Sequence, residues 1–210
     1  MIGPAIRSRL LQLRRDLEAA RDGRDLLDRK REAIVRALAE RLPRLITCRR
    51  DAEGVLAAAH DALAAAQDQL GRAAVAGAAL AQPLLTDCER DEVITASVRI
   101  PRVRLAGRQF RPEYGPASGS SSLDRAGAGF ATALTALAAL AAEDAAVRAL
   151  RLALRHTARR LNALDHVVLP QIAGDIRGIV TTLEEDDRDE AARRKVGSRN
   201  RVDSSSPLIG

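Results

Sequence analysis

The sequence predicts an all-α protein, a long antiparallel two-helix coiled coil with a short central hairpin or loop segment. Alanine, leucine, arginine and glutamate dominate the 210 residues, a composition typical of long helices. The aromatic residues are Tyr114, Phe110 and Phe130, with no tryptophan, whereas a compact core of this size normally uses large rings. This composition disfavours a β-sandwich, a barrel or a doubly wound sheet. The 46% of hydrophobic residues disfavours disorder throughout.

The first predicted segment is a coiled-coil helix over residues 1–81. Apolar residues recur there in alternating steps of four and three, and nine of the twelve positions are apolar. This 3.5-residue period, kept for more than five heptads, indicates a left-handed coiled coil. Pro43 is expected to kink the helix or open one turn. The twelve positions are Ile6, Leu10, Leu13, Leu17, Ala20, Arg24, Leu27, Arg31, Ile34, Leu38, Arg41 and Leu45.

The second predicted segment, residues 82–122, is a connector. Residues 93–100 are rich in β-branched side chains, and a short extended piece follows at 103–105. These stretches predict a short hairpin or two separate extended pieces. Residues 107–122 are rich in glycine, proline and serine, which indicates a loop. A connector of about this length allows the two helices to fold back on one another antiparallel.

The third predicted segment is a coiled-coil helix over residues 123–196, followed by a flexible tail over 197–210. From Val168 the seam steps become four, four and three, an eleven-residue repeat that relaxes the supercoil. Pro170 lies in the same stretch, so a local flexure without a break is expected at 162–170. The seam reads Phe130, Leu134, Leu137, Val147, Leu150, Leu154, Thr157, Leu161, Leu164, Val168, Ile172, Ile176 and Ile179.

The charge distribution indicates a protein partner. The net charge is +6, and residues 1–50 alone carry 14 basic and 7 acidic residues, or +7. Acidic residues alternate with the arginines, the heptads run through the same block, and no aromatic side chain is available there for stacking on bases. The sequence therefore predicts no nucleic-acid binding. We expect the basic helix to face an acidic protein surface.

Motifs for chemistry are incomplete, so no catalytic, cofactor-binding or metal-binding residues are predicted. Gly127-Ala128-Gly129 lacks the third glycine of a phosphate loop and no strand precedes it. His60, His156 and His166 lack metal-ligand spacing. The acidic run at 184–187 is best explained as a solvated helix face. Cys48 and Cys88 form no CxxC pair, so two reduced thiols are the default, although a disulfide stays open.

Neither a signal peptide nor a membrane span is predicted. The first thirteen residues have no apolar block after their arginines. The longest uncharged stretch, 126–142, is rich in alanine and is shorter and less apolar than a spanning helix requires. We therefore expect a soluble, cytoplasmic chain without direct membrane insertion.

Two stretches resemble a known family. Residues 14–32 contain Ala20-Arg21-Asp22-Gly23, then Leu26-Leu27 and Lys30-Arg31-Glu32. Residues 157–170 contain Arg159-Arg160-Leu161-Asn162-Ala163-Leu164-Asp165 and end at Pro170. Both stretches are similar to motifs of the D subunit of the V-type and archaeal-type ATP synthases. The resemblance covers nearly the whole chain. It departs from the family pattern at Arg24, at Asp165 in place of Glu, at Leu161 in place of Val, and in Pro43 and the low aromatic content.

The resemblance implies a function. The D subunit is the central stalk, or rotor shaft, which transmits torque between the membrane ring and the catalytic head and so couples ion transport to ATP synthesis or hydrolysis. It implies a non-catalytic chain without cofactors. The implied partners are the A and B subunits of the catalytic head, the small F subunit of the stalk and the funnel-shaped C subunit on the membrane ring. The implied location is the cytoplasmic side of the membrane, within a peripheral complex. The alternative is a generic coiled-coil scaffold protein.

Overall fold

The computed structural model describes residues 3–82, 86–107, 110–114 and 120–203. The chain divides into two compact units. Unit 1 combines Met1–Arg29 with Thr157–Gly210, and unit 2 is Lys30–His156. Both long helices contribute to both units, and each unit is described separately below.

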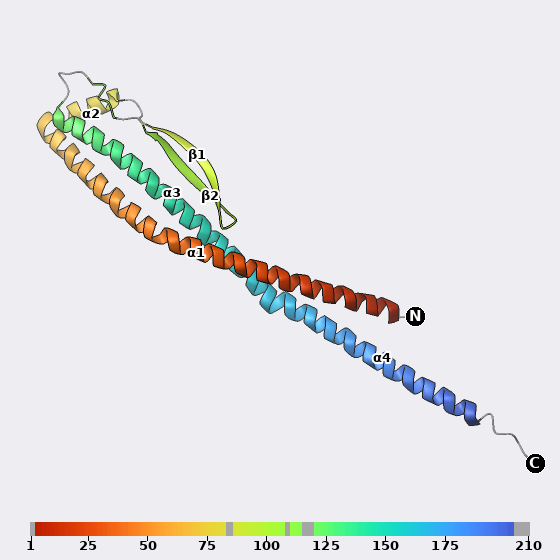
Figure 1. The fold of residues 1–210 in the computed structure, drawn as a ribbon. Helices are drawn as coiled ribbons and strands as arrows, with labels where there is room; N and C mark the ends of the chain where they lie inside the picture. Colours follow the sequence, from red (N-terminus) through yellow and green to blue (C-terminus); the bar gives the residue numbers. More distant parts are fainter. Residues whose placement is uncertain (1–2, 83–85, 108–109, 115–119, 204–210) are drawn as a thin grey trace, which may run out of the picture. The chain divides into compact units, whose positions relative to one another are not determined.

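The N-terminal half is helical, as its periodicity predicts. Helix α1 spans Gly3–Leu70 and continues through Pro43 (Figure 1). The short helix α2, Arg72–Ala81, follows a break at Gly71. Gly71 adopts φ +80°, a left-handed conformation that glycine adopts without a steric penalty, and its N–H donates to the carbonyl of Gln67 over 2.8 Å. The apolar periodicity did not predict this break.

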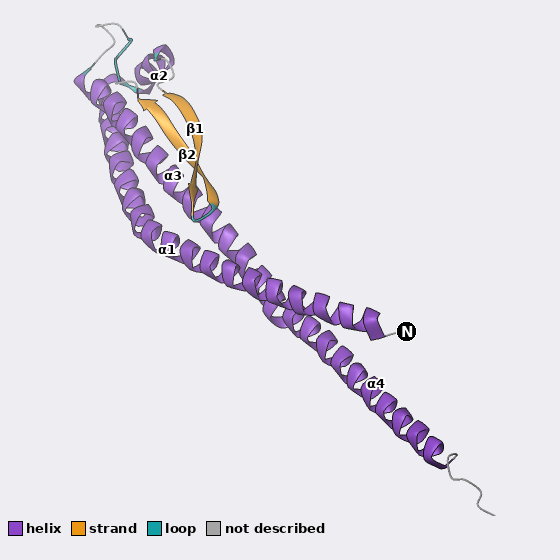
Figure 2. Cartoon of the chain, turned by 45° about the vertical axis from the view of Figure 1, so that its right-hand side comes forward, coloured by secondary structure: helices purple, strands orange, loops and turns teal. Residues whose placement is uncertain are grey.

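The connector contains a regular antiparallel hairpin. Strand β1, Thr86–Thr95, pairs with β2, Val98–Gly107, and Thr95 lies opposite Val98 (Figure 2). The two-residue turn is Ala96-Ser97, with φ of 50° and 59°. Such turns normally use Asn-Gly, because both residues need positive φ. The 93–100 stretch therefore contains the turn rather than one continuous extended run. Pro101 is accommodated because a two-stranded sheet has only edge strands.

The C-terminal half changes helical geometry where its periodicity changes. Helix α3, Ser121–Ala163, leads into a π-helix, η1, Leu164–Val168, and then into α4, Leu169–Asp203. The N–H of Leu169 bonds to the carbonyl of Leu164, five residues back. The flexure expected at 162–170 is thus a π-helix in a continuous helix. The tail expected from 197 is helical as far as Asp203, and 204–210 lie outside the described residues.

In unit 2, α1 and α3 pack antiparallel around two apolar clusters. Residues further along α1 contact residues nearer the start of α3, as expected for an antiparallel pair. The contacts are Arg41 with Glu143, His60 with Phe130, and Gln69 with Ser122. The first cluster, which we call the hairpin core, joins Ile34, Ala37 and Leu38 of α1, Ile100 of β2, and Ala146, Val147 and Leu150 of α3. The second joins Ala66, Val75, Ala78 and Leu123. Ile100 thus anchors the hairpin to both long helices.

Alanine mediates the α1–α3 contact beyond the hairpin core. Ala52, Ala59 and Ala66 recur every seven residues on α1 and are buried, as are Ala126 and Ala133 on α3. A Cβ added at Gly129 would lie 3.2 Å from Cβ of Ala59, so the backbones approach closely. This corrects the seam predicted at Leu134 and Leu137, which are 38% and 37% exposed. The two helices can approach closely because the side chains at the contact are small. Leu134 and Leu137 therefore lie at the edge of the contact between the helices.

Unit 1 packs α1 antiparallel to the C-terminal helices with fewer buried side chains. Arg7 pairs with Asp187, and Arg24 pairs with Asp165. The two helices therefore run in opposite directions. Leu13, Thr157 and Leu161 are buried, while the seam leucines Leu17 and Leu27 are half-buried. The charged positions in the predicted seam have partners: in unit 1 Arg24 bonds to Asp165, and in unit 2 Arg41 bonds to Glu143.

One helical stretch, Ser121–Lys195, contains an 18-residue window with a mean hydropathy of 1.5, long and apolar enough by those measures to cross a membrane; 17% of that window is buried. This differs from the expectation for residues 126–142. In residues 126–133 of this stretch, Ala126 and Ala133 are buried, and a Cβ added at Gly129 would contact Ala59 of α1.

Tyr114 links the connector to the start of α3. Its hydroxyl donates a hydrogen bond to Oδ1 of Asp124, in the first turn of α3. Partial burial, followed by this bond and the nearby negative charge, raises the pKa of Tyr114 from 10.0 to about 12. All three favour the neutral phenol over the phenolate.

The titration of Tyr114 is directly measurable, because the chain has one tyrosine and no tryptophan. We expect the tyrosinate absorbance of the folded protein to rise with a midpoint near 12, and in urea with a midpoint near the ordinary value of about 10. Because the folded pKa is the higher one, this stabilisation is fully present below about pH 10 and is lost as the pH rises towards 12. Asp124→Asn is expected to lower the folded midpoint. A folded wild-type midpoint of about 10 would contradict the contact.

Candidate functional surfaces

The residues considered for chemistry have structural roles where the structure describes them. The ring of Phe110 lies directly against Gly127, where it would overlap an added Cβ, and Gly129 faces Ala59. The Gly127-Ala128-Gly129 sequence therefore serves packing. His60 meets Phe130 edge-on, with ring centroids 5.4 Å apart. Within the described ranges, no group of three histidine, cysteine or acidic residues is arranged to hold a metal ion.

The remaining candidates also lie apart. His156 and His166 are exposed on α3 and η1, and Asp165 beside His166 pairs with Arg24. In the acidic run, Glu184 pairs with Arg188 and Asp187 with Arg7, as expected for a solvated face. Cys48 is a half-buried free thiol. Cys88 is in β1, and its side chain lies outside the described residues.

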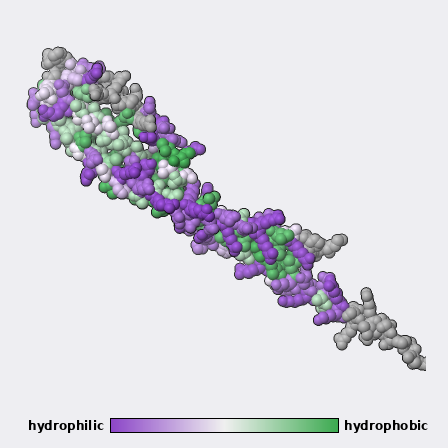
Figure 3. Space-filling model, viewed as in Figure 1, coloured by the Kyte–Doolittle hydropathy of each residue, from purple (hydrophilic) through white to green (hydrophobic). Residues whose placement is uncertain are grey.

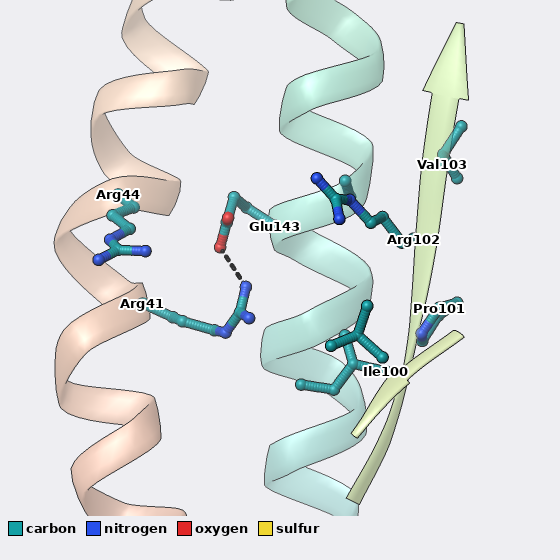
Figure 4. A pocket seen from close by; sticks show the side chains of 9 residues that line it. Arg41, Arg44, Ile100, Pro101, Arg102, Val103 and Glu143 are labelled. Atoms are coloured by element: carbon teal, nitrogen blue, oxygen red, sulfur yellow. Dashed lines mark hydrogen bonds and ion pairs between the residues drawn. The ribbon is translucent and has the colours of Figure 1, made fainter. Parts of the chain in front are cut away.

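A hollow in unit 2 lies where the hairpin meets the long helices. Its volume is about 250 Å³, and its lining combines α1, β1, β2 and α3. Figure 4 shows Arg41 of α1 directed at Glu143 of α3, and Arg102 reaching from β2 towards α3. The Arg41–Glu143 distance is 3.0 Å, with side chains 23% and 22% exposed. This half-buried pair crosses the two helices beside the hairpin and helps to fix their register.

The hairpin presents Ile94 on its outer face, where this side chain is 73% exposed. Figure 3 shows a hydrophobic area over the hairpin. Ile94 pairs with Arg99 across the ladder, so it lies on the opposite face from Ile100 and away from the core. The hairpin therefore has a face anchored by Ile100 and an outward face with an exposed isoleucine, Ile94.

Unit 1 has exposed arginines next to an open groove. The groove has a volume of about 670 Å³ and lies between α1 and α4. Its apolar lining includes Ile6, Leu13 and Ile179, and Arg9 stands at its side. Arg7 and Asp187 pair at 3.7 Å, with side chains 68% and 67% exposed. An ion pair this exposed contributes little to stability, so these charges remain available to a partner.

Arg24 lies close to three carboxylates in unit 1. Its Nε lies 3.1 Å from Oδ1 of Asp165, and its Nη1 lies 3.1 Å from Asp25 and 4.0 Å from Asp28. Hydrogen bonds to Asp25 and then Asp165 raise the pKa of Arg24. The sequence placed Arg24 at a charged position of the predicted seam. It could not indicate the partner of Arg24, because Asp165 is 141 residues away. The motif around Asp165 resembled the family pattern but did not reveal this contact.

Comparison with known proteins agrees with these features. The family of ATP synthase D subunits matches residues 9–198. The D subunit of the A-type ATP synthase of Methanosphaera stadtmanae is 31% identical over 92% of this chain and 92% of its own. The D subunits of the V-type ATP synthases of Thermus thermophilus and Deinococcus radiodurans are 32% and 27% identical, each over 90% of this chain and 84% of theirs. The chain therefore belongs to the family of ATP synthase D subunits.

Proposed function

We propose that this chain is the central stalk subunit of a rotary ATP synthase and transmits torque between a membrane ring and a catalytic head. The observation that carries the proposal is the antiparallel pairing of two long helices in both units of a chain of this family. Torque transmission needs a continuous seam and cross-helix ties, and it needs no chemistry from the shaft itself. The chain would act as a non-catalytic subunit, and the generic scaffold is the competing function.

The proposed partners follow from the same assignment. Unit 1, which contains both chain termini, would enter the head formed by the A and B subunits. The small F subunit would dock on the hairpin, and the funnel-shaped C subunit would connect the chain to the membrane ring. The complex would lie on the cytoplasmic side of the membrane. Co-purification with the A and B subunits of the head tests the assignment, because a scaffold protein has no reason to bind them.

Docking of the F subunit on the hairpin predicts a role for its outward face. Ile94→Asp replaces an exposed apolar side chain with a charge without changing the Ile100 anchor. We expect it to weaken binding of the F subunit about tenfold, as for loss of a central apolar contact. Leu26→Asp, an equally exposed leucine of unit 1, is the control. Titration of the labelled F subunit gives both affinities, and equal values for the Ile94 variant and the wild type would exclude the hairpin as the docking site.

The basic excess predicts a salt-dependent association with the head. Changing Arg7, Arg9 and Arg14 to glutamate lowers the net charge of residues 1–50 from +7 to +1. We expect slower association with the A and B subunits, by a larger factor at low salt than at high salt, because salt screens exposed charges. Association rates measured by surface capture at several salt concentrations check this.

A matched charge reversal uses Arg125, Arg151 and Arg155, which are exposed in unit 2 and lie outside residues 1–50. We expect its effect on the association rate to be smaller than that of the unit 1 reversal. Equal losses would show that net charge alone matters. Tight binding of the wild type to duplex DNA with a steep salt dependence would instead support a nucleic-acid partner.

A further inference from the structure

A π-helix turn holds one more residue than an α-helical turn over a similar length. In η1 the N–H of Leu169 bonds five residues back to Leu164, and Pro170, which follows, has no N–H to donate. If the same residues became α-helical, every later residue would advance by one position. We propose that η1 is a register switch that lets α4 occupy two registers against α1 in unit 1, with the Arg24–Asp165 pair holding the observed register.

Packing after η1 leaves the register weakly specified. Among the described residues from 162 to 195, no side chain is buried, whereas Leu161 just before them is 3% exposed. Knobs seated in holes normally fix the register of a coiled coil. Here an added Cβ at Gly174 or Gly178 would meet nothing within 4 Å. The 670 Å³ groove beside them leaves room for α4 to turn.

The ion pairs also tolerate the change. If Arg24 releases Asp165, it keeps Asp25 at 3.1 Å and Asp28 at 4.0 Å on its own helix. The released carboxylate is already 36% exposed, so water can solvate it. At the other tie, Arg7 faces Asp187, and the residue that would replace Asp187 in the second register is Asp186. An acid therefore stands opposite Arg7 in both registers.

The shift would be small in length and large in angle. One α-helical residue corresponds to a rise of about 1.5 Å and a rotation of about 100°. The register switch is a property of this chain alone and does not depend on the central stalk assignment. If that assignment holds, the switch gives one helix of the shaft a discrete compliant step.

Cross-linking reports the register directly in the full-length chain. In a Cys48→Ser, Cys88→Ser background, one protein carries Arg7→Cys with Asp187→Cys and another carries Arg7→Cys with Asp186→Cys. A short dithiol-specific cross-linker joins the first pair in the observed register and the second in the shifted one. We expect the first pair to dominate when Asp165 is intact.

Breaking the Arg24–Asp165 pair should redistribute the products. Asp165→Asn is expected to raise the ratio of the 186 product to the 187 product at least about twofold, the scale of one part-exposed ion pair. Asp22→Asn, which removes an exposed acid from α1, should leave the ratio unchanged. Arg24→Gln breaks the pair from the other side, and circular dichroism verifies that each variant remains helical.

Deletion of one η1 residue supplies the decisive control. Removing Val167, which is 59% exposed, takes out the extra residue while keeping later residues in their observed places. In that background Asp165→Asn should not change the product ratio. The register switch is wrong if Asp165→Asn and Arg24→Gln leave the ratio at the wild-type value, or if the deletion background responds as strongly as the full-length chain.

Discussion

Leu150→Ala is expected to destabilise unit 2 by about 2–5 kcal/mol, the range for loss of a fully buried leucine. Leu150 has 0% exposure and lies in the hairpin core with Ile34 and Ile100. That core joins three elements, so the cavity forms where both long helices and the hairpin meet. The packed neighbours, such as Ile34 and Val147, are fixed in the same core and can fill the space only in part. Urea unfolding followed by circular dichroism measures the loss.

Leu152→Ala is the matched control for this prediction. It makes the same change two residues further along α3, at a side chain that is 57% exposed. We expect a loss of less than about 1 kcal/mol there, because little apolar area leaves the interior. Equal losses for the two variants would show that the hairpin core does not hold unit 2 together.

Ala59→Leu is expected to destabilise unit 2 by about 1–3 kcal/mol or more, through overpacking. The Cα of Ala59 lies 3.3 Å from where a Cβ on Gly129 would be, so the two backbones leave no room for a leucine side chain. The larger residue would push α1 and α3 apart over the alanine-packed stretch. The loss would appear in urea unfolding although the substitution adds apolar surface.

Ala58→Leu is the control that distinguishes overpacking at the helix contact from the general effect of replacing an alanine with a leucine. Ala58 is the exposed neighbour of buried Ala59, so the same residue is added one position away from the contact. We expect little change in the free energy of unfolding for this variant. If Ala59→Leu were as stable as Ala58→Leu, the close approach of α1 and α3 would be wrong.

Periodicity predicted the long helices because it is a local, repeated signal. Heptads located the seam through Leu13, Ile34 and Leu38. The change of repeat at Val168 and Pro170 predicted a flexure, but the π-helix over Leu164–Val168 was not predicted. The prediction failed where small residues carry the packing. Leu134 and Leu137 were assigned to the seam for their hydrophobicity, whereas Ala133 is buried beside them. Choosing between the two faces requires the distance between the helices, which the sequence does not state.

Features that depend on tertiary support were also missed. The Ala96-Ser97 turn has no glycine or asparagine, and Ala96 packs on the hairpin core, which compensates for an unfavourable φ. The pairing of Arg24 with Asp165 joins opposite ends of the sequence, so no local pattern reveals it. The motifs around both residues did indicate the family, because they were similar to its sequence patterns rather than because their contacts could be inferred.

Rotation of this chain inside an immobilised head of A and B subunits tests the proposed function most directly. A bead attached through Leu80→Cys, in a Cys48→Ser, Cys88→Ser background, would report the motion, because Leu80 is 89% exposed in α2. Torque transmission predicts that the bead turns in one direction when ATP is added and stops when ATP is removed. A head that binds the chain and hydrolyses ATP while the attached bead stays still would contradict it.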